Sequence, residues 1–188
     1  MSNSSAKKDF LIALALVVTG AVIFSSWFAF RLPESTLPEG GMAQLKVGTE
    51  APPIQAAGWV NGDPHQNDYL KGKVIVVDAW ATWCGPCRMA APHLVEVHEK
   101  FKDQNVAFVG LTSDGEDLLP VIQEWLDETG ITWPNGYGAI DSLLAFKAEF
   151  IPQVWVIGTD GKVVWNVDSE RTESLEEGIA RALKLAQQ

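Results

Sequence analysis

The chain has 188 residues, of which 47% are hydrophobic and eight are Trp, and its formal net charge is −10. This length and composition are typical of a globular domain with a sizeable core and exclude a disordered chain. The acidic residues are spread along the sequence, and no basic patch is present. Nucleic acid is therefore not expected as a partner, because binding to phosphates requires such a patch.

The first thirty-one residues differ from the rest of the chain. Lys7 and Lys8 precede a run of uncharged residues from Phe10 to Phe30, and Arg31 follows. A helix of this length spans a ~30 Å hydrocarbon core, and the run is longer than the apolar region of a secretory signal. We therefore predict an uncleaved N-terminal membrane anchor over residues 1–31. A cleaved signal and a buried core helix are the alternatives.

The two lysines before the apolar run favour a cytoplasmic N-terminus and place the rest of the chain outside the membrane. A Pro-, Glu- and Gly-rich linker is predicted over residues 32–46, and a globular domain over residues 47–188. Disulfides persist in an extracytoplasmic compartment. The chain has only two Cys, both in one short motif, so no framework of structural disulfides is expected and the pair is predicted to serve chemistry.

The first part of the domain predicts a hairpin followed by a parallel crossover. An Asn-Gly turn at 61–62 lies between short extended pieces and predicts an N-terminal β-hairpin extension. The β-branched run at 74–80 predicts a strand buried on both faces, followed by a helix at 85–101 and a second buried strand at 106–111. This order indicates an α/β domain. The apolar positions of the helix are Met89, Leu94, Val97 and Phe101.

The second part of the domain predicts three further elements. A helix over 113–130 ends at a glycine, and a shorter helix follows at 141–150. Two strands flank an Asp-Gly turn at 160–161, the strongest short hairpin signal. A capping box that begins at Ser174 opens a C-terminal amphipathic helix. The tryptophans expected to pack in or against the core are Trp80, Trp125, Trp133, Trp155 and Trp165.

The two cysteines lie in the sequence WCGPC, where the strand at 74–80 gives way to a helix. Cys84 faces the free N–H groups and the positive end of the helix dipole, which favour the nucleophilic thiolate. Pro86 suits the first helical turn because its missing N–H has no partner to lose. Cys87 is expected to be more enclosed and to attack a mixed disulfide formed at Cys84. We therefore predict that Cys84 attacks and Cys87 resolves.

This order of elements, with Cys-Gly-Pro-Cys at the first strand–helix junction, resembles the thioredoxin fold over residues 47–187. It is most similar to the membrane-anchored extracytoplasmic thiol-disulfide oxidoreductases of the TlpA and ResA family, through the segments VGTEAPPI, LKGKVIVVDAWATWCGPCRMAAP and FIPQVWVIGTDGKVV. The resemblance implies an α/β domain with a central mixed β-sheet flanked by helices. With the predicted hairpin extension and transmembrane helix, this is the expected fold.

The resemblance also implies a substrate-binding surface around the cysteines. Ile151 and Pro152 are expected to form a cis-proline loop that faces them, with a backbone edge at Ile151 that pairs with an extended substrate segment. Trp83, Gly85 and Pro86 are expected to complete this surface, with Trp83 in its docking lip. The family often has Thr after the proline, whereas this chain has Gln153.

Asp78 lies six residues before Cys84, where thioredoxins carry a buried acid. No Lys or Arg accompanies it in the local sequence, so burial should raise its pKa. We predict that Asp78 accepts a proton from Cys87, and the alternative is an Asp turned to solvent at a strand end. Many anchored family members carry a Glu three residues after the second cysteine, where this chain has Ala90.

Three other roles for the cysteine pair fit the sequence less well. A purely structural disulfide would contribute little, because closing a four-residue loop stabilises the folded state by only about 2 kcal/mol. A zinc site would need two more ligands, and His93 and His98 follow too closely for zinc-finger spacing. A copper-delivery domain of this fold more often has a three-residue spacer and a distant His. We predict redox catalysis without a metal or other cofactor.

The predicted function is that of an extracytoplasmic thiol-disulfide oxidoreductase. The spacer between Cys84 and Cys87 has no basic side chain and an anionic Asp78 opposes thiolate formation, which favours a reductase. The resemblance implies disulfide-containing exported proteins as substrates, including apocytochrome c, and a membrane thiol donor of the CcdA or DsbD type. The alternatives are a dithiol oxidase or isomerase, and a redox-inert or metal-binding module.

Overall fold

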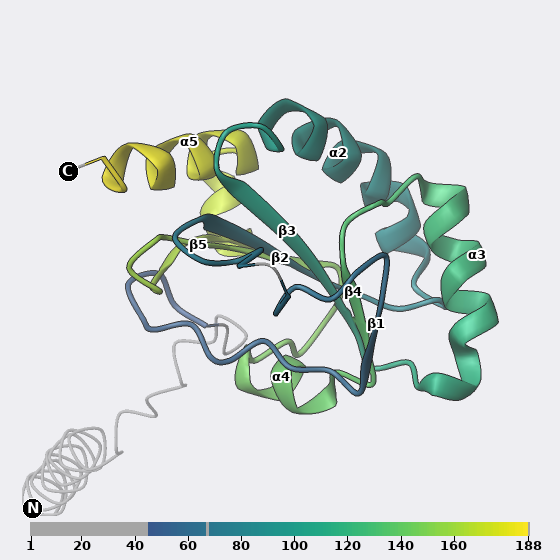
Figure 1. The fold of residues 1–188 in the computed structure, drawn as a ribbon. Helices are drawn as coiled ribbons and strands as arrows, with labels where there is room; N and C mark the ends of the chain where they lie inside the picture. The colour runs from purple at the N-terminus through teal and green to yellow at the C-terminus, as the bar shows by residue number, and fades with distance from the viewer. Residues whose placement is uncertain (1–44, 67, 188) are drawn as a thin grey trace, which may run out of the picture. The chain divides into compact units, whose positions relative to one another are not determined.

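A six-stranded mixed sheet forms the centre of the domain (Figure 1). The computed structural model describes residues 45–66 and 68–187. The strand order is β1-β4-β3-β2-β5-β6. The strands are β1 (Gly58–Val60), β2 (Val74–Trp80), β3 (Val106–Thr112), β4 (Asn135–Tyr137), β5 (Gln153–Ile157) and β6 (Val163–Asn166). The helices are α2 (Gly85–Phe101), α3 (Leu119–Thr129), α4 (Ile140–Ala145) and α5 (Leu175–Leu185), with 3-10 turns η1 (Glu116–Leu118) and η2 (Val167–Arg171).

Strand β2 lies inside the sheet, parallel to β3 and antiparallel to β5. Both faces of the sheet are covered, which explains why β2 is a continuous apolar run instead of an alternating one. The β2–α2–β3 crossover brings the end of β2 directly to the start of α2. The predicted thioredoxin-like mixed sheet is confirmed, and the cysteine motif lies at this strand–helix junction.

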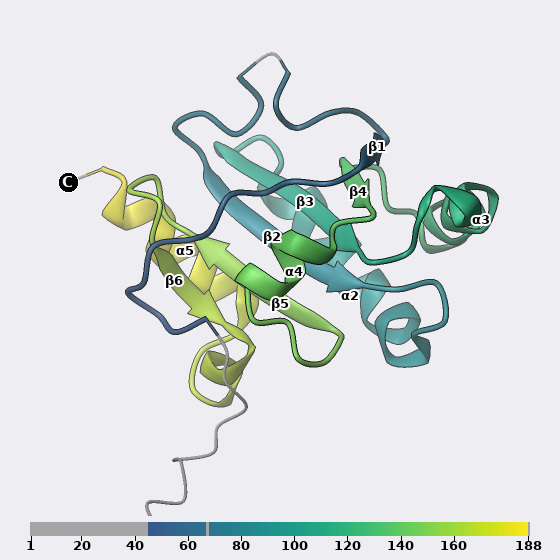
Figure 2. The same cartoon turned by 90° about the horizontal axis from the view of Figure 1, so that it is seen from below.

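The side chains of β2 alternate between two separate cores. Val76 and Trp80 pack with residues of α2, α3 and α5. Val77 and Ala79 pack on the other face, with α4 and the segment that precedes β1 (Figures 1 and 2). Because successive side chains of a strand point to opposite faces, Asp78 shares the face of Val76 and Trp80 and points toward α2.

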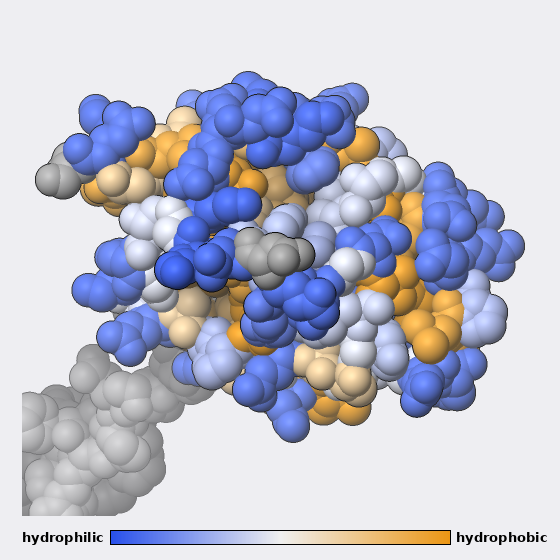
Figure 3. Space-filling view, viewed as in Figure 1, coloured by the Kyte–Doolittle hydropathy of each residue, from blue (hydrophilic) through white to orange (hydrophobic). Residues whose placement is uncertain are grey.

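Hydrophilic residues cover much of the outer surface of α2 and α3, and hydrophobic residues are visible between these helices and the rest of the domain (Figure 3). Of the predicted apolar positions of α2, Leu94, Val97 and Phe101 are buried. Met89 is an exception, because its side chain is 77% exposed. The position of Met89 on the outward side of α2, not its hydrophobicity, decides this exposure.

The predicted N-terminal hairpin is wrong. Strand β1 pairs antiparallel with β4, with Gly58 opposite Tyr137 and Val60 opposite Asn135. In the described part of the chain, no strand lies between β1 and β2. The Asn-Gly pair does turn the chain, since Asn61 has φ 60, but the turn is followed by further turns. Strand β4 has only three residues and two of them are poor strand formers, so the sequence did not predict it.

The other local predictions are confirmed with two changes of length. The helix predicted over 113–130 begins at Leu119, after the 3-10 turn η1. Gly130 ends α3 in the left-handed region with φ 74, and Ser174 and Glu177 form the predicted capping box of α5. Strands β5 and β6 flank the Asp-Gly turn at 160–161. Helix α4 ends at Ala145, earlier than predicted, and the chain then turns back into β5.

The predicted anchor and most of the predicted linker lie outside the described residues. Within residues 45–66 and 68–187, no helix is both long enough and apolar enough to cross a bilayer.

Candidate active site

The two cysteines form a disulfide at the N-terminus of α2, with a Cα–Cα distance of 5.3 Å. Cys84 is the N-cap residue, and its sulfur accepts a hydrogen bond of 3.1 Å from the backbone N–H of Cys87. Pro86 lies in the first turn of the helix, as predicted. A sulfur in this position faces the positive end of the helix dipole, which stabilises negative charge on Cys84 after reduction.

The expected difference in burial between the cysteines is wrong for this disulfide form, because Cys84 and Cys87 are each only 3% exposed. Their surroundings differ instead. Cys87 lines a partly open cavity, whereas Cys84 is flanked by three exposed residues. These are Trp83, Gly85 and Pro86.

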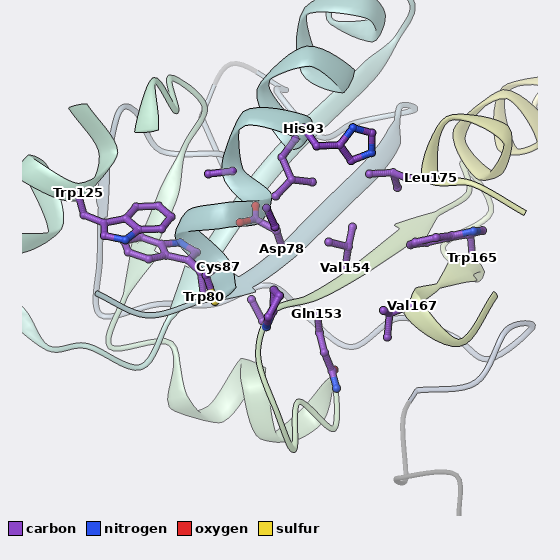
Figure 4. A pocket seen from close by; sticks show the side chains of 15 residues that line it. Asp78, Trp80, Cys87, His93, Trp125, Gln153, Val154, Trp165, Val167 and Leu175 are labelled. Atoms are coloured by element: carbon purple, nitrogen blue, oxygen red, sulfur yellow. The ribbon is translucent and has the colours of Figure 1, made fainter. Parts of the chain in front are cut away.

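A cavity of about 110 Å³ borders Cys87 and is lined by residues of α2, β2, β5 and α5 (Figure 4). Most of its lining is apolar, and Asp78 and Cys87 both border it. Asp78 is buried, so the alternative of an Asp turned to solvent is wrong. A carboxyl group and a cysteine therefore share one small, largely apolar space.

The surroundings of Asp78 shift the pKa of its carboxyl group well above the ordinary value. Burial raises the pKa of Asp78 to about 7, and a hydrogen bond from the indole N–H of Trp133 to Oδ1 opposes part of this rise. That bond is 3.2 Å long. No Lys or Arg is among the side chains that line the cavity, so no cation offsets the burial of the charged form.

The Ile151–Pro152 peptide is cis, as the resemblance implied. Pro152 borders the same cavity as Cys87. Gln153 pairs with Ala79 across the sheet, and its amide points away from Asp78 (Figure 4). Both polar atoms of this buried amide lack a hydrogen-bond partner among the described residues.

A groove of about 470 Å³ borders Trp83, the residue before Cys84. Trp83, which is 74% exposed, and Ile151 belong to its lining, so two of the predicted substrate-binding residues lie together. Helix α4 contributes the exposed apolar side chains of Ile140 and Leu144. Sequence reasoning missed this contribution, because α4 is more than fifty positions beyond the cysteines.

Sequence reasoning also missed a buried polar network behind Asp78. Trp133 was expected to pack in the core, and it does, but its N–H also contacts Asp78. Asn135 connects Trp133 to Trp80 by two further hydrogen bonds. The Trp-Pro-Asn sequence at 133–135 carries no periodic signal that would have predicted these contacts.

Comparison with known proteins places this geometry in a family. A sequence profile of the AhpC/TSA family matches residues 47–166. The chain belongs to the AhpC/TSA family. The match covers the sheet from β1 to β6 and includes the cysteines, Asp78 and the cis-proline.

This AhpC/TSA family member is similar to two proteins named thiol-disulfide oxidoreductase ResA. The one from Bacillus thuringiensis (strain Al Hakam) is 25% identical over 175 residues, which cover 93% of this chain and 95% of that protein. The one from Bacillus subtilis (strain 168) is 26% identical over 166 residues, which cover 88% and 85%.

A crystal structure from Chlorobium tepidum, described as a thiol:disulfide interchange protein DsbE, has the same fold. It superimposes with a TM-score of 0.59 at 22% identity and covers 74% of this chain and 99% of that one. The predicted enzyme class is confirmed: this AhpC/TSA family member is a thiol-disulfide oxidoreductase of the thioredoxin-like type. Among the described residues, no three His, Cys, Asp or Glu side chains cluster in a way that could hold a metal ion.

Proposed function

We propose that the protein is a membrane-anchored, extracytoplasmic reductase of disulfides in exported proteins. The observation that carries the proposal is the shared cavity of Asp78 and Cys87, next to a helix N-terminus that holds Cys84. This arrangement provides a nucleophile, a resolving thiol and a proton acceptor within one site.

In the proposed reaction, the Cys84 thiolate attacks one sulfur of a substrate disulfide. The substrate S–S bond breaks, and the first substrate sulfur leaves as a thiolate that takes a proton from water. Cys87 then passes its proton to Asp78 and attacks the Cys84 sulfur of the mixed disulfide. The second substrate sulfur leaves as a thiolate and takes up a proton, and Asp78 releases its proton and returns to the charged form. The substrate thus gains two electrons and two protons, and the enzyme ends with the Cys84–Cys87 disulfide.

The electrostatics of the cavity favour the reducing direction. A stable thiolate makes a strong oxidant, because it stabilises the reduced form of the enzyme. The cavity has no Lys or Arg in its lining, and an ionised Asp78 disfavours a second negative charge on Cys87. We therefore expect a reduction potential near that of thioredoxin, about −270 mV, and well below the roughly −120 mV of DsbA.

The groove that borders Trp83 is the proposed docking site for the polypeptide that carries the substrate disulfide. Exposed Trp83, Ile140 and Leu144 offer apolar contact area next to Cys84. Ile151 offers a backbone edge for an extended segment. Apocytochrome c before haem attachment is one proposed substrate.

The proposed location rests on the apolar run Phe10–Phe30 and the two lysines before it. Outside the membrane no soluble nicotinamide system is at hand, so the Cys84–Cys87 disulfide needs an electron source within the membrane. A membrane thiol donor of the CcdA or DsbD type is the proposed partner.

The deciding experiment is equilibration of the purified chain against glutathione and dithiothreitol series, with the reduced fraction measured by alkylation. A potential near that of thioredoxin would support the reductase. A potential near that of DsbA would instead favour the dithiol oxidase or isomerase. A redox-inert binding module would keep its affinity for a partner after both cysteines are replaced by serine.

A further inference from the structure

The carboxyl group of Asp78 has a single side-chain hydrogen-bond partner among the described residues, the indole N–H of Trp133. Both residues are buried, and the sequence separates them by 55 positions. A hydrogen bond that is donated to a carboxylate stabilises the charged form over the neutral form. The bond from Trp133 therefore favours the charged form of an acid that borders the same cavity as Cys87.

A hydrogen bond holds the backbone of Trp133, and two aromatic rings pack against its indole. Asn135 donates from Nδ2 to the backbone oxygen of Trp133 at 2.8 Å, and its Oδ1 accepts from the indole N–H of Trp80 at 2.9 Å. The ring of Trp133 packs against the rings of His98 and Phe108, with centroids 5.0 and 5.3 Å away. A donor fixed in this way cannot readily turn to another partner.

Strand β3 leaves room for this network because Gly110 lies beside it. A Cβ atom at Gly110 would overlap Oδ1 of Asn135 and come within 3.0 Å of the indole nitrogen of Trp80. Gly110 is also the residue opposite Asp78 in the β2–β3 pairing. The residue that makes room for the Asn135–Trp80 hydrogen bond is therefore also the strand partner of Asp78.

We propose that Trp133 is a positioning residue that orients Asp78 and stabilises its charged form, and so sets the pH at which the mixed disulfide resolves. This inference rests on the proposed role of Asp78 as the proton acceptor of Cys87. It concerns a residue that contacts neither the substrate nor the sulfurs, and it acts through the acid.

The other titratable groups around Asp78 are few. From α2, Cys87 and His93 border the cavity, and His98 packs against Trp133. Burial lowers the pKa of His98, so it is largely neutral near pH 7 and adds little charge behind the indole. The residues that β5, α3 and α5 contribute to the cavity lining do not titrate. Trp133 is thus the principal polar contact through which the protein adjusts Asp78.

The test compares wild type with W133F, using the reduced full chain and 5,5′-dithiobis(2-nitrobenzoate). The first thionitrobenzoate release reports attack by Cys84, and the second, concentration-independent release reports resolution by Cys87. Loss of the donor should raise the pH midpoint of resolution by about one unit, since hydrogen bonds to charged groups are strong. Resolution should then be about tenfold slower on the acidic side and should converge with wild type on the alkaline side.

W155F is the matched control. Trp155 is equally buried, but it lies on the other face of the sheet and its indole N–H has no partner among the described residues. It should keep the wild-type midpoint. Slower resolution by the same factor at every pH in W133F, or an equal shift in W155F, would overturn the proposal.

D78N separates this inference from the function on which it rests. If Asp78 is the acceptor, D78N slows resolution, and adding W133F to D78N shifts the midpoint no further. If D78N resolves at the wild-type rate with the wild-type midpoint, the role of Asp78 fails and the role of Trp133 fails with it. If D78N resolves slowly but W133F keeps the wild-type midpoint, only the role of Trp133 fails.

A second variant covers the case in which W133F does not fold. Replacement of Trp133 by 3-benzothienylalanine removes the N–H donor and keeps the ring shape, and the same outcomes apply.

Discussion

Replacement of Asp78 by Asn should change how the stability of the oxidised protein depends on pH. Burial raises the pKa of Asp78 from 3.8 to about 7 in the folded state. The folded protein therefore binds this proton more tightly than the unfolded chain does. The stabilisation from the protonated acid is fully present below pH 4 or so, is lost progressively as the pH rises, and is absent above a pH of about 7.

The size of the effect follows from the shift. Each pKa unit corresponds to about 1.4 kcal/mol, so the free energy of unfolding of wild type should fall relative to D78N by about 4 kcal/mol across this window. The oxidised form is the right state to test, because neither cysteine titrates in a disulfide. D78N also keeps an oxygen that can accept the N–H of Trp133.

The assay is urea unfolding of the oxidised full chain in mild detergent, followed by tryptophan fluorescence at a series of pH values. D78A is the companion variant. It should lose the same pH dependence but be less stable than D78N throughout, because it leaves the N–H of Trp133 without an acceptor. A difference between wild type and D78N that stays constant with pH, or that grows in favour of wild type as the pH rises, would contradict a raised pKa of Asp78.

Three further predictions concern the dithiol, the sheet and the membrane. C84S should abolish disulfide reduction, whereas C87S should still attack substrates and accumulate mixed disulfides; labelling of Cys87 before Cys84 by limiting alkylating reagent would reverse these roles. G110A should destabilise the protein by about 1–3 kcal/mol in urea unfolding, because its methyl group overlaps Asn135; wild-type stability would contradict the described packing. A membrane-impermeant thiol reagent should label Cys84 in intact cells, and the protein should stay with the membrane after a carbonate wash; labelling only after lysis would place the domain in the cytosol.

Elements with local signals could be predicted from the sequence alone. The β-branched run of β2, the Asp-Gly turn of the last hairpin and the capping box at Ser174 each depend on a few neighbouring residues. The cysteine motif belongs to the same class, because its chemistry depends on a strand end, a helix start and a spacing of three. These signals were sufficient to predict an α/β domain and the reactive pair, and the thioredoxin-like fold was implied by the resemblance that the cysteine motif and its neighbouring segments carry.

Burial of Asp78 was also predictable, because it lies in a run that is apolar on both sides. The identity of its partner was not. Trp133 reaches it across 55 positions through a loop without periodicity, and only the packing of β3 and β4 brings the two together.

The same reason explains the wrong hairpin and the unexpected lining of the groove. Strand β1 lies beside a good turn signal, but it pairs with β4. The apolar composition of α4 did not indicate that its exposed Leu144 borders the same groove as Trp83. A residue pattern fixes which face of an element is apolar, whereas contacts between distant segments depend on how the whole chain packs. In this protein the position of the reactive cysteines could be predicted from the local sequence. The contact between Trp133 and Asp78 depends on the tertiary structure.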